Sequence, residues 1–112
     1  MPFIDTKTNV KITKEQETAL KTGFGKAISL IGKSEAWLML NFESGCSMYF
    51  KGDDSPCAIA EVKLYGSASP SAYNALTAKL TELLSSTLSI SPSRIYVKYD
   101  EIEYWGMGGH NF

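Results

Sequence analysis

The chain has 112 residues, of which 44% are hydrophobic and 12% aromatic, so it can form one domain with a packed core and is too apolar to be disordered. Eleven basic and twelve acidic residues are scattered along it and leave a net charge of −1, which argues against a nucleic-acid partner. Two cysteines and one histidine cannot supply the ligands of a structural zinc site. We treat residues 1–112 as a single domain and expect no metal and no cofactor.

No run of about 18 apolar residues could span a membrane. Residues 1–5 (MPFID) lack the basic start and the long apolar stretch of a signal peptide. We therefore expect a cytoplasmic protein with no membrane partner. If the protein is secreted, its export uses no signal peptide.

The first half of the chain predicts a strand, a helix and two further strands. Strand-forming residues 3–4 are followed by a polar turn and by Thr13 and Gln16, which have the spacing of a capping box. Apolar residues then recur on one helical face, at Leu20, Phe24, Ala27, Ile28 and Ile31. Gly32 stands where a helix ends. Residues 36–42 (AWLMLNF) are apolar enough to predict a buried strand, and residues 47–50 predict a short one.

The second half repeats this order. Residues 57–65 alternate like a strand, and Ser69 and Pro70 predict the cap and first position of a helix. The leucines of this helix repeat the spacing of the first helix, at Leu76, Leu80, Leu83, Leu84 and Leu88. Pro92 predicts its end, residues 94–100 predict a last strand, and a glycine-rich aromatic tail follows.

The two halves align at an offset of 56 residues, as from Leu20 to Leu76. This pattern predicts an α+β fold of two β-α-β units, which form a four-stranded mixed sheet with both helices on one face. Because residues 36–42 are apolar on both sides, we expect the other face to be apolar and covered by further copies of the chain. The sequence therefore predicts a homo-oligomer.

Pro2 is the strongest single candidate for chemistry. Initiator methionine is usually removed before proline, which would expose a secondary amine at the start of a buried strand. Burial and a neighbouring lysine would lower the pKa of this amine below about 8 and allow it to act as a general base. Each candidate also has an ordinary explanation by itself: Pro2 as an incidental start, Lys33 as a solvated lysine, Tyr96 as a core residue and His110 as part of the tail.

Together these features resemble the macrophage migration inhibitory factor family of the tautomerase superfamily. The resemblance runs along the whole chain and rests on order and spacing. Its elements are residues 1–4 (MPFI), 8–10 (TNV), 32–33 (GK), 55–57 (SPC), Gly66, 90–97 (ISPSRIYV) and the tail from Gly106 to Phe112.

The resemblance implies a homotrimer whose sheets line a central channel, with an active site at each subunit interface. It implies that Pro2 moves a proton between carbon and oxygen of a small aromatic α-keto acid, as general base and acid. Lys33 would bind the substrate carboxylate, the backbone of Tyr65 would offer a hydrogen bond beside it, and Tyr96 would come from the neighbouring subunit. The aromatic pocket wall would comprise Trp37, Trp105, Met107 and Phe112.

The chain departs from the family pattern at four positions. Ala60 replaces the second cysteine of a Cys-x-x-Cys motif, so Cys57 has no local resolving thiol and we expect no thiol–disulfide activity. Lys98 stands where an asparagine is frequent and would add an anion contact or fill part of the pocket. Tyr65 is bulkier than usual and would narrow the site, and Met107 replaces an aromatic residue.

Three functions are open at this point. The first is a keto–enol tautomerase of phenylpyruvate-like acids, and the second is a cytokine-like homologue that binds a host cell-surface receptor. The third is an oligomer without activity. The dehalogenating and hydrating branch of the superfamily is disfavoured because it typically needs additional arginines, and Arg94 is the only arginine of the chain.

Overall fold

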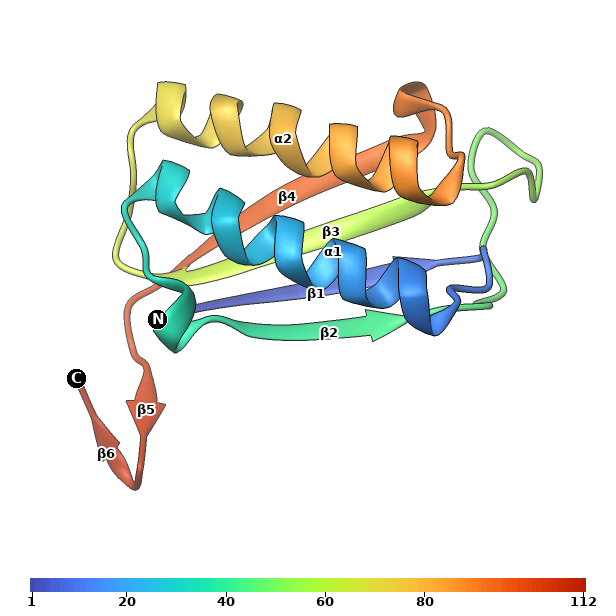
Figure 1. Ribbon diagram of the computed structural model, residues 1–112. Coiled ribbons are helices and arrows are strands. Elements are labelled where there is room, and N and C mark those ends of the chain that lie inside the picture. Colours follow the sequence, from blue (N-terminus) through green and yellow to red (C-terminus); the bar gives the residue numbers. More distant parts are fainter.

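A four-stranded sheet carries two helices on one of its faces in the computed structural model, which describes residues 1–112 (Figure 1). The main elements are β1 (Pro2–Thr8), α1 (Lys14–Ala27), β2 (Met39–Glu43), β3 (Ala58–Tyr65), α2 (Pro70–Leu88) and β4 (Ile95–Ile102). The short elements are the 3-10 turns η1 (Ile28–Ile31), η2 (Glu35–Trp37) and η3 (Pro92–Arg94), and the hairpin strands β5 (Gly106–Met107) and β6 (His110–Asn111).

The sheet confirms the two β-α-β units. Strand β1 pairs in parallel with β2, and β3 pairs in parallel with β4, while the central strands β1 and β3 are antiparallel. In this central pair Asp5 lies opposite Glu61, and these residues are separated by the same 56 positions that relate the two halves of the sequence. The two units are therefore related by a local two-fold axis that passes between Asp5 and Glu61.

Local sequence signals place the helix ends. Thr13 accepts a hydrogen bond from the Gln16 backbone at 3.1 Å, and the Gln16 side chain accepts one from the Thr13 backbone at 2.9 Å, so the predicted capping box is confirmed. Gly32 ends the first helical segment with a φ of +73°. Helix α2 begins after the Ser69 cap and ends at Leu88, earlier than predicted, because Ser89 has a left-handed backbone; Pro92 opens the separate turn η3.

The core lies between the helices and the sheet. It contains the predicted apolar faces of both helices and the alternate side chains of the strands, among them Ile4, Leu20, Phe24, Ile28, Ala60, Val62, Leu64, Leu76, Leu80 and Leu84, all fully buried. Gly23 allows the helices to approach closely, because a Cβ atom at this position would meet the Leu83 side chain at 2.8 Å. A side chain at this position would therefore displace Leu83, and the glycine that weakens α1 as an isolated helix leaves room for it.

Two strand predictions in the middle of the chain are wrong. Residues 35–37 form the turn η2, and the strand that follows is an edge strand with one free side. Leu40 and Phe42 pack against the core, but Met39 is 66% exposed, so this strand is not buried. Residues 47–50 form no strand, because they have no neighbouring strand to pair with in the protomer and only Phe50 makes an isolated bridge, to Asp53.

The centre of the uncovered sheet face is charged, and the expected bare apolar face is also wrong. Glu61 lies 3.4 Å from the Lys7 ammonium, 3.2 Å from Lys63 and 3.8 Å from Lys98, while Asp5 contacts Lys7 at 2.8 Å. Pairs of opposite charge can face water without a partner. The expectation of an oligomer therefore cannot rest on an apolar sheet face.

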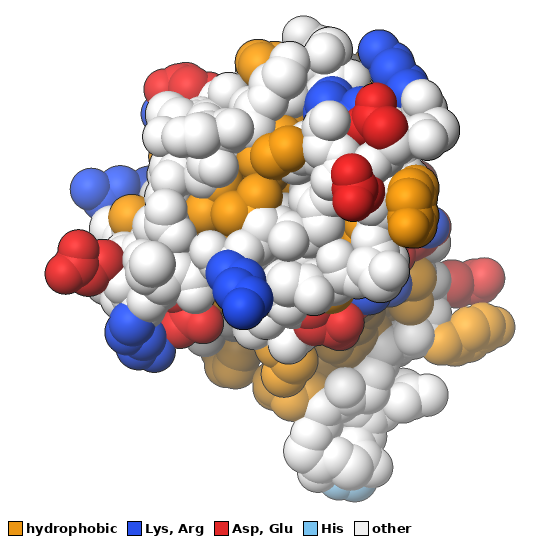
Figure 2. Space-filling view, turned by 90° about the vertical axis from the view of Figure 1, so that its right-hand side faces the viewer, with side chains coloured by type: hydrophobic (Ala, Val, Ile, Leu, Met, Phe, Trp, Pro, Cys, Tyr) orange, Lys and Arg blue, Asp and Glu red, His pale blue; other side chains and the backbone are white.

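The hairpin β5–β6 projects from the body of the protomer (Figure 1). The end view shows it below the body, with hydrophobic side chains above it interspersed among charged ones (Figure 2). All four residues of the two hairpin strands are exposed. No helix is both long and apolar enough to cross a membrane.

Candidate active site

Pro2 lies at the start of the inner strand β1, where its ring is buried. The register places it opposite Leu64 near the end of β3, and Leu64 in turn lies opposite Glu101 on β4. The beginning of the chain, the end of β3 and the end of β4 therefore meet at one edge of the sheet.

Lys33 reaches this edge from the helical layer. It follows the left-handed Gly32 that ends η1, and its ammonium group donates a hydrogen bond of 2.9 Å to the carbonyl oxygen of Tyr65. The ammonium also lies close to Gly66, whose φ of +92° favours glycine: a Cβ atom there would be 3.5 Å from the Lys33 Nζ. The structure thus brings Lys33 and Tyr65 together, as the predicted site requires.

The peptide groups of Tyr65 connect Lys33 with the amino terminus. The Tyr65 carbonyl accepts the Lys33 hydrogen bond, and the Tyr65 N–H donates to the Met1 carbonyl at 3.1 Å. Partial burial, and secondarily the positive charge of Lys33, lower the pKa of the Met1 amino group below its ordinary value of 8.0. A cation and an amine with a lowered pKa therefore both lie beside the peptide groups of Tyr65.

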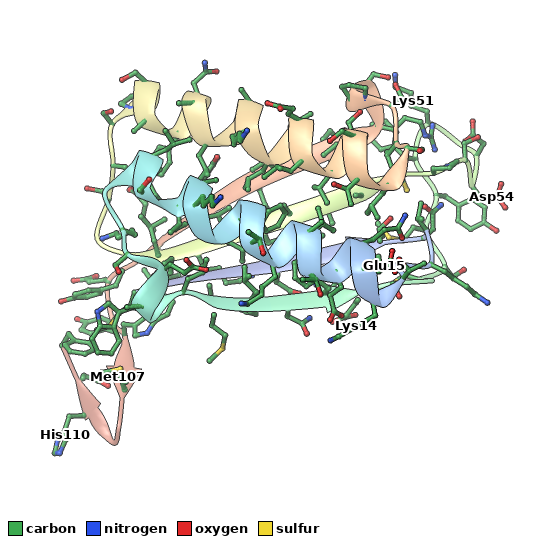
Figure 3. All side chains as sticks on the ribbon, in the orientation of Figure 1. Lys14, Glu15, Lys51, Asp54, Met107 and His110 are labelled. Carbon is green, nitrogen blue, oxygen red and sulfur yellow. The ribbon has the colours of Figure 1, made fainter.

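Aromatic side chains form one wall beside this segment. The rings of Tyr65 and Phe112 pack with centroids 5.9 Å apart, and the Phe112 N–H donates to the Trp105 carbonyl at 3.0 Å. Met107 lies on the projecting hairpin, at the same end of the molecule as the N-terminus (Figure 3). Trp37 lies on η2 and is 55% exposed. In one protomer Trp37, Met107 and Phe112 are exposed to solvent.

Tyr96 and Lys98 lie away from Pro2 in the same protomer. Tyr96 pairs with Ile59, five residues before Leu64, which places it about 16 Å along the sheet from the Pro2 row. Its ring is 59% exposed and meets the Phe50 ring edge-on at 4.9 Å. The Lys98 ammonium lies 3.4 Å from Asp100 and belongs to the charged face. Neither side chain joins the Pro2 site within one protomer.

The two hollows of the protomer lie elsewhere. One of about 290 Å³ is lined mainly by the segment 46–49 with Asn9, Asp54 and Pro56, and one of about 640 Å³ lies between α1 and β2. Neither includes Pro2 or Lys33. The candidate site is therefore an open corner in one protomer, and a complete pocket needs further walls.

Tyr73 and Glu101 were not predicted from the sequence but lie behind this corner. The Tyr73 hydroxyl donates to Glu101 at 2.5 Å and accepts the Ala68 N–H at 3.0 Å. These residues are far apart in the sequence, and only the strand register shows that Glu101 lies beside the end of β3. A tyrosine in the first turn of α2 is the only local signal.

The remaining reactive side chains lie apart. His110 is exposed on the hairpin, at its projecting end (Figure 3). Cys57 is buried and Cys46 partly exposed, and both are free thiols. No three His, Cys, Asp or Glu side chains gather where they could hold a metal ion.

Comparisons with known proteins agree with this geometry. The sequence profile of the macrophage migration inhibitory factor family matches residues 1–111. The chain is 29% identical to the macrophage migration inhibitory factor homolog of Brugia malayi, over 92% of this chain and 90% of that protein. It is 23% identical to the D-dopachrome decarboxylase of Gallus gallus, over 96% and 92% of the two chains.

Among solved structures, the crystal structure of Leishmania major MIF2 superposes with a TM-score of 0.94 at 27% identity, covering 100% of this chain and 97% of that one. The profile match, the relatives and the superposition each span nearly the whole chain. The chain therefore belongs to the macrophage migration inhibitory factor family, and its two helices on a four-stranded mixed sheet form the fold of the tautomerase superfamily.

Proposed function

We propose that the protein is a keto–enol tautomerase of small aromatic α-keto acids such as phenylpyruvate, with Pro2 as general base and acid. One observation carries the proposal: the Lys33 ammonium is fixed on the Tyr65 carbonyl, next to an amino terminus whose pKa it helps to lower. Deprotonation beside a keto group needs a neutral amine and a cation for the carboxylate. The Lys33 ammonium and the Met1 amine lie at this corner, and loss of Met1 would make the Pro2 amine the terminal one.

Removal of Met1 would complete the site in two ways. Loss of Met1 makes Pro2 the amino terminus, so the reactive group becomes a secondary amine at the start of β1. Loss of Met1 also removes the carbonyl that accepts the Tyr65 N–H in the unprocessed chain. The Tyr65 N–H then becomes a free donor beside the Lys33 ammonium, and both can bind the two oxygens of a substrate carboxylate.

The reaction needs two proton transfers. The neutral Pro2 amine takes a proton from the carbon next to the keto group: the C–H bond breaks and an N–H bond forms, the C–H electron pair becomes the new C=C bond, and the π pair of the C=O bond moves onto the carbonyl oxygen. The ammonium then returns a proton to that oxygen and gives the enol. A pKa near the working pH allows one group to perform both steps.

We also propose that the protein works as a homotrimer. In one protomer the site is an open corner, Trp37 and Tyr96 are exposed, and β2 is an edge strand with one free side. In the trimer, Tyr96 from a neighbouring subunit would close the corner and bind the substrate, and Trp37, Trp105, Met107 and Phe112 would form its wall. Lys98 would contribute at the subunit interface.

A second candidate function is binding of a host cell-surface receptor. It is favoured by the similarity to the macrophage migration inhibitory factor homolog of Brugia malayi. The chicken relative named D-dopachrome decarboxylase supports an activity on a small carboxylated compound instead. Receptor binding that survives loss of the Pro2 amine would separate the two functions.

The test is the interconversion of enol and keto phenylpyruvate, followed by ultraviolet absorbance after mass spectrometry has confirmed loss of Met1. Pro2→Gly keeps a terminal amine but changes its class and position, and we expect a loss of about 10²-fold or more in kcat/KM. Lys26→Met is the matched control, because Lys26 is an exposed lysine in the last turn of α1. Wild-type trimer without activity would contradict the proposal, as would full activity in Pro2→Gly.

A further inference from the structure

Tyr73 holds the connection between β3 and α2 through one oxygen atom. Its hydroxyl accepts the Ala68 N–H at 3.0 Å and donates to the Glu101 carboxylate at 2.5 Å. Ala68 lies in the short connection that follows Tyr65 and Gly66, and Glu101 lies on β4. The hydroxyl therefore ties this connection to the strand that flanks β3.

The tied connection follows directly on the backbone that places Lys33. The Lys33 ammonium is held by the Tyr65 carbonyl and lies against Gly66, where a Cβ atom would be 3.5 Å from the Lys33 Nζ. Gly66 has a left-handed backbone and no side chain, so it contributes nothing of its own to keep this turn in place. The hydrogen bond from Ala68 to Tyr73 is the side-chain contact that restrains the turn just beyond it.

We propose that Tyr73, supported by Glu101, is a positioning residue for the Lys33 ammonium and the Tyr65 peptide groups. The inference rests on the proposed function, because it assigns Tyr73 a part in binding the substrate carboxylate. Tyr73 itself touches neither substrate nor Pro2. It acts through the backbone of residues 65–68, which carries the Lys33 acceptor and the N–H that loss of Met1 would free.

A neighbouring tyrosine supplies a matched control. The Tyr99 ring packs against Tyr73 at 4.5 Å, and its hydroxyl donates to the Tyr73 carbonyl at 3.0 Å and lies 2.8 Å from the Thr77 hydroxyl. The Tyr99 hydroxyl makes no hydrogen bond with the connection at Ala68. Tyr99→Phe therefore removes a hydroxyl from the same aromatic pair without loosening residues 65–68.

Two measurements test the proposal in the trimer lacking Met1. At about pH 9, where the Pro2 amine is mostly neutral in both proteins, we expect KM for phenylpyruvate to rise about tenfold in Tyr73→Phe with kcat within about twofold of wild type, because small displacements of a binding group weaken binding steeply. KM for the methyl ester, which has no carboxylate charge, should stay unchanged. Tyr99→Phe should leave KM for both substrates unchanged, and equal increases in the two variants would overturn the proposal.

The second measurement does not need turnover. ¹⁵N NMR of the Pro2 amine gives its pKa, which we expect Lys33 to lower, as it does for the Met1 amine, only while its charge is held nearby. In Tyr73→Phe this pKa should rise but stay below its ordinary value, because burial, the larger cause of the shift, remains; in Tyr99→Phe it should equal that of wild type. An unchanged pKa in Tyr73→Phe overturns the positioning role. A wild type without tautomerase activity contradicts the proposed function, but a pKa that rises only in Tyr73→Phe would still support the positioning role.

Glu101→Gln provides the conservative variant. Its amide oxygen can still accept the Tyr73 hydroxyl, so the connection at Ala68 should keep its anchor. We expect KM within about twofold of wild type, whereas Glu101→Leu, which has no acceptor, should move KM in the direction of Tyr73→Phe. Equal KM values in Glu101→Leu and wild type would show that Glu101 does not support Tyr73.

Discussion

Replacing Lys33 by methionine would remove the cation of the proposed site and keep a side chain of similar length. The Lys33 ammonium has three N–H donors and gives one of them to the Tyr65 carbonyl, so two remain for a substrate carboxylate. A hydrogen bond to a charged group is worth about 1.5–3 kcal/mol, which corresponds to a rise of about 10- to 160-fold in KM. We expect Lys33→Met to fall in this range.

The same substitution should change the pH profile. Lys33 lowers the pKa of the amino terminus, so its loss should move the acid limb of kcat/KM to higher pH, because the amine must be neutral to act as a base. The assay is phenylpyruvate tautomerisation from pH 5 to pH 9, with Lys26→Met as the control for loss of an exposed lysine. An unchanged KM together with an unshifted acid limb would refute the role of Lys33.

Three further predictions concern stability and specificity. Glu61→Gln should lower the free energy of unfolding in urea by about 2 kcal/mol, because it breaks three partly exposed contacts with lysines that are each worth up to about 1 kcal/mol. The control Glu17→Gln breaks one exposed pair and should cost less than about 0.5 kcal/mol; equal losses in the two variants would contradict the reasoning. The hydrogen bond from Lys63 lowers the pKa of Glu61 below its ordinary 4.5, against the opposite effect of burial. The contribution of ionised Glu61 to the free energy of unfolding is therefore present above pH 4.5 and is lost as the pH falls through the lowered pKa. A wild-type free energy of unfolding that stays constant from pH 6 to pH 3 would refute this. Tyr65→Ile removes the ring that packs on Phe112 and should raise kcat/KM for α-keto acids bulkier than phenylpyruvate, measured as a ratio to phenylpyruvate; an unchanged ratio would show that this ring does not limit the site.

The helices could be predicted from the sequence because their signals are local. The capping box at Thr13, the leucine spacing of α2 and Gly32 each lie within a few residues of the feature they specify. The repeat of 56 residues then predicted that the two strands flanking each helix are parallel neighbours, because β-α-β connections are nearly always right-handed. Both β-α-β units and the mixed sheet followed from these signals.

Position at the sheet edge could not be predicted in the same way. The apolar run at residues 36–42 satisfies both a buried central strand and an edge strand that presents Met39 outward. The charged side chains of the uncovered face alternate along β1 and β3, but only the register shows that Lys7, Lys63 and Lys98 converge on Glu61. Non-local pairing decides both cases.

The residues of the candidate site likewise fall into those that could be predicted from the sequence and those that depend on non-local contacts. Pro2 and Lys33 could be singled out from the sequence, and the structure brings the amino terminus, Lys33 and the Tyr65 backbone together. Tyr96 and Lys98 lie apart from them in one protomer, and their place in the site stays a prediction that depends on the trimer. The role of Tyr73 could not be predicted, because only folding brings Glu101 and the Ala68 N–H to its hydroxyl.

The local two-fold axis between Asp5 and Glu61 relates Pro2 to Ala58, the first residue of β3. Ala58 occupies the equivalent place in the second unit, yet its nitrogen is part of a peptide bond in the middle of the chain. A chain has one amino terminus, so a second β-α-β unit in the same chain cannot supply a second terminal amine. For a reaction that depends on such an amine, a fold made of two similar halves still has one reactive centre per chain, and the end of the second half nearest Ala58 is released from catalytic constraint.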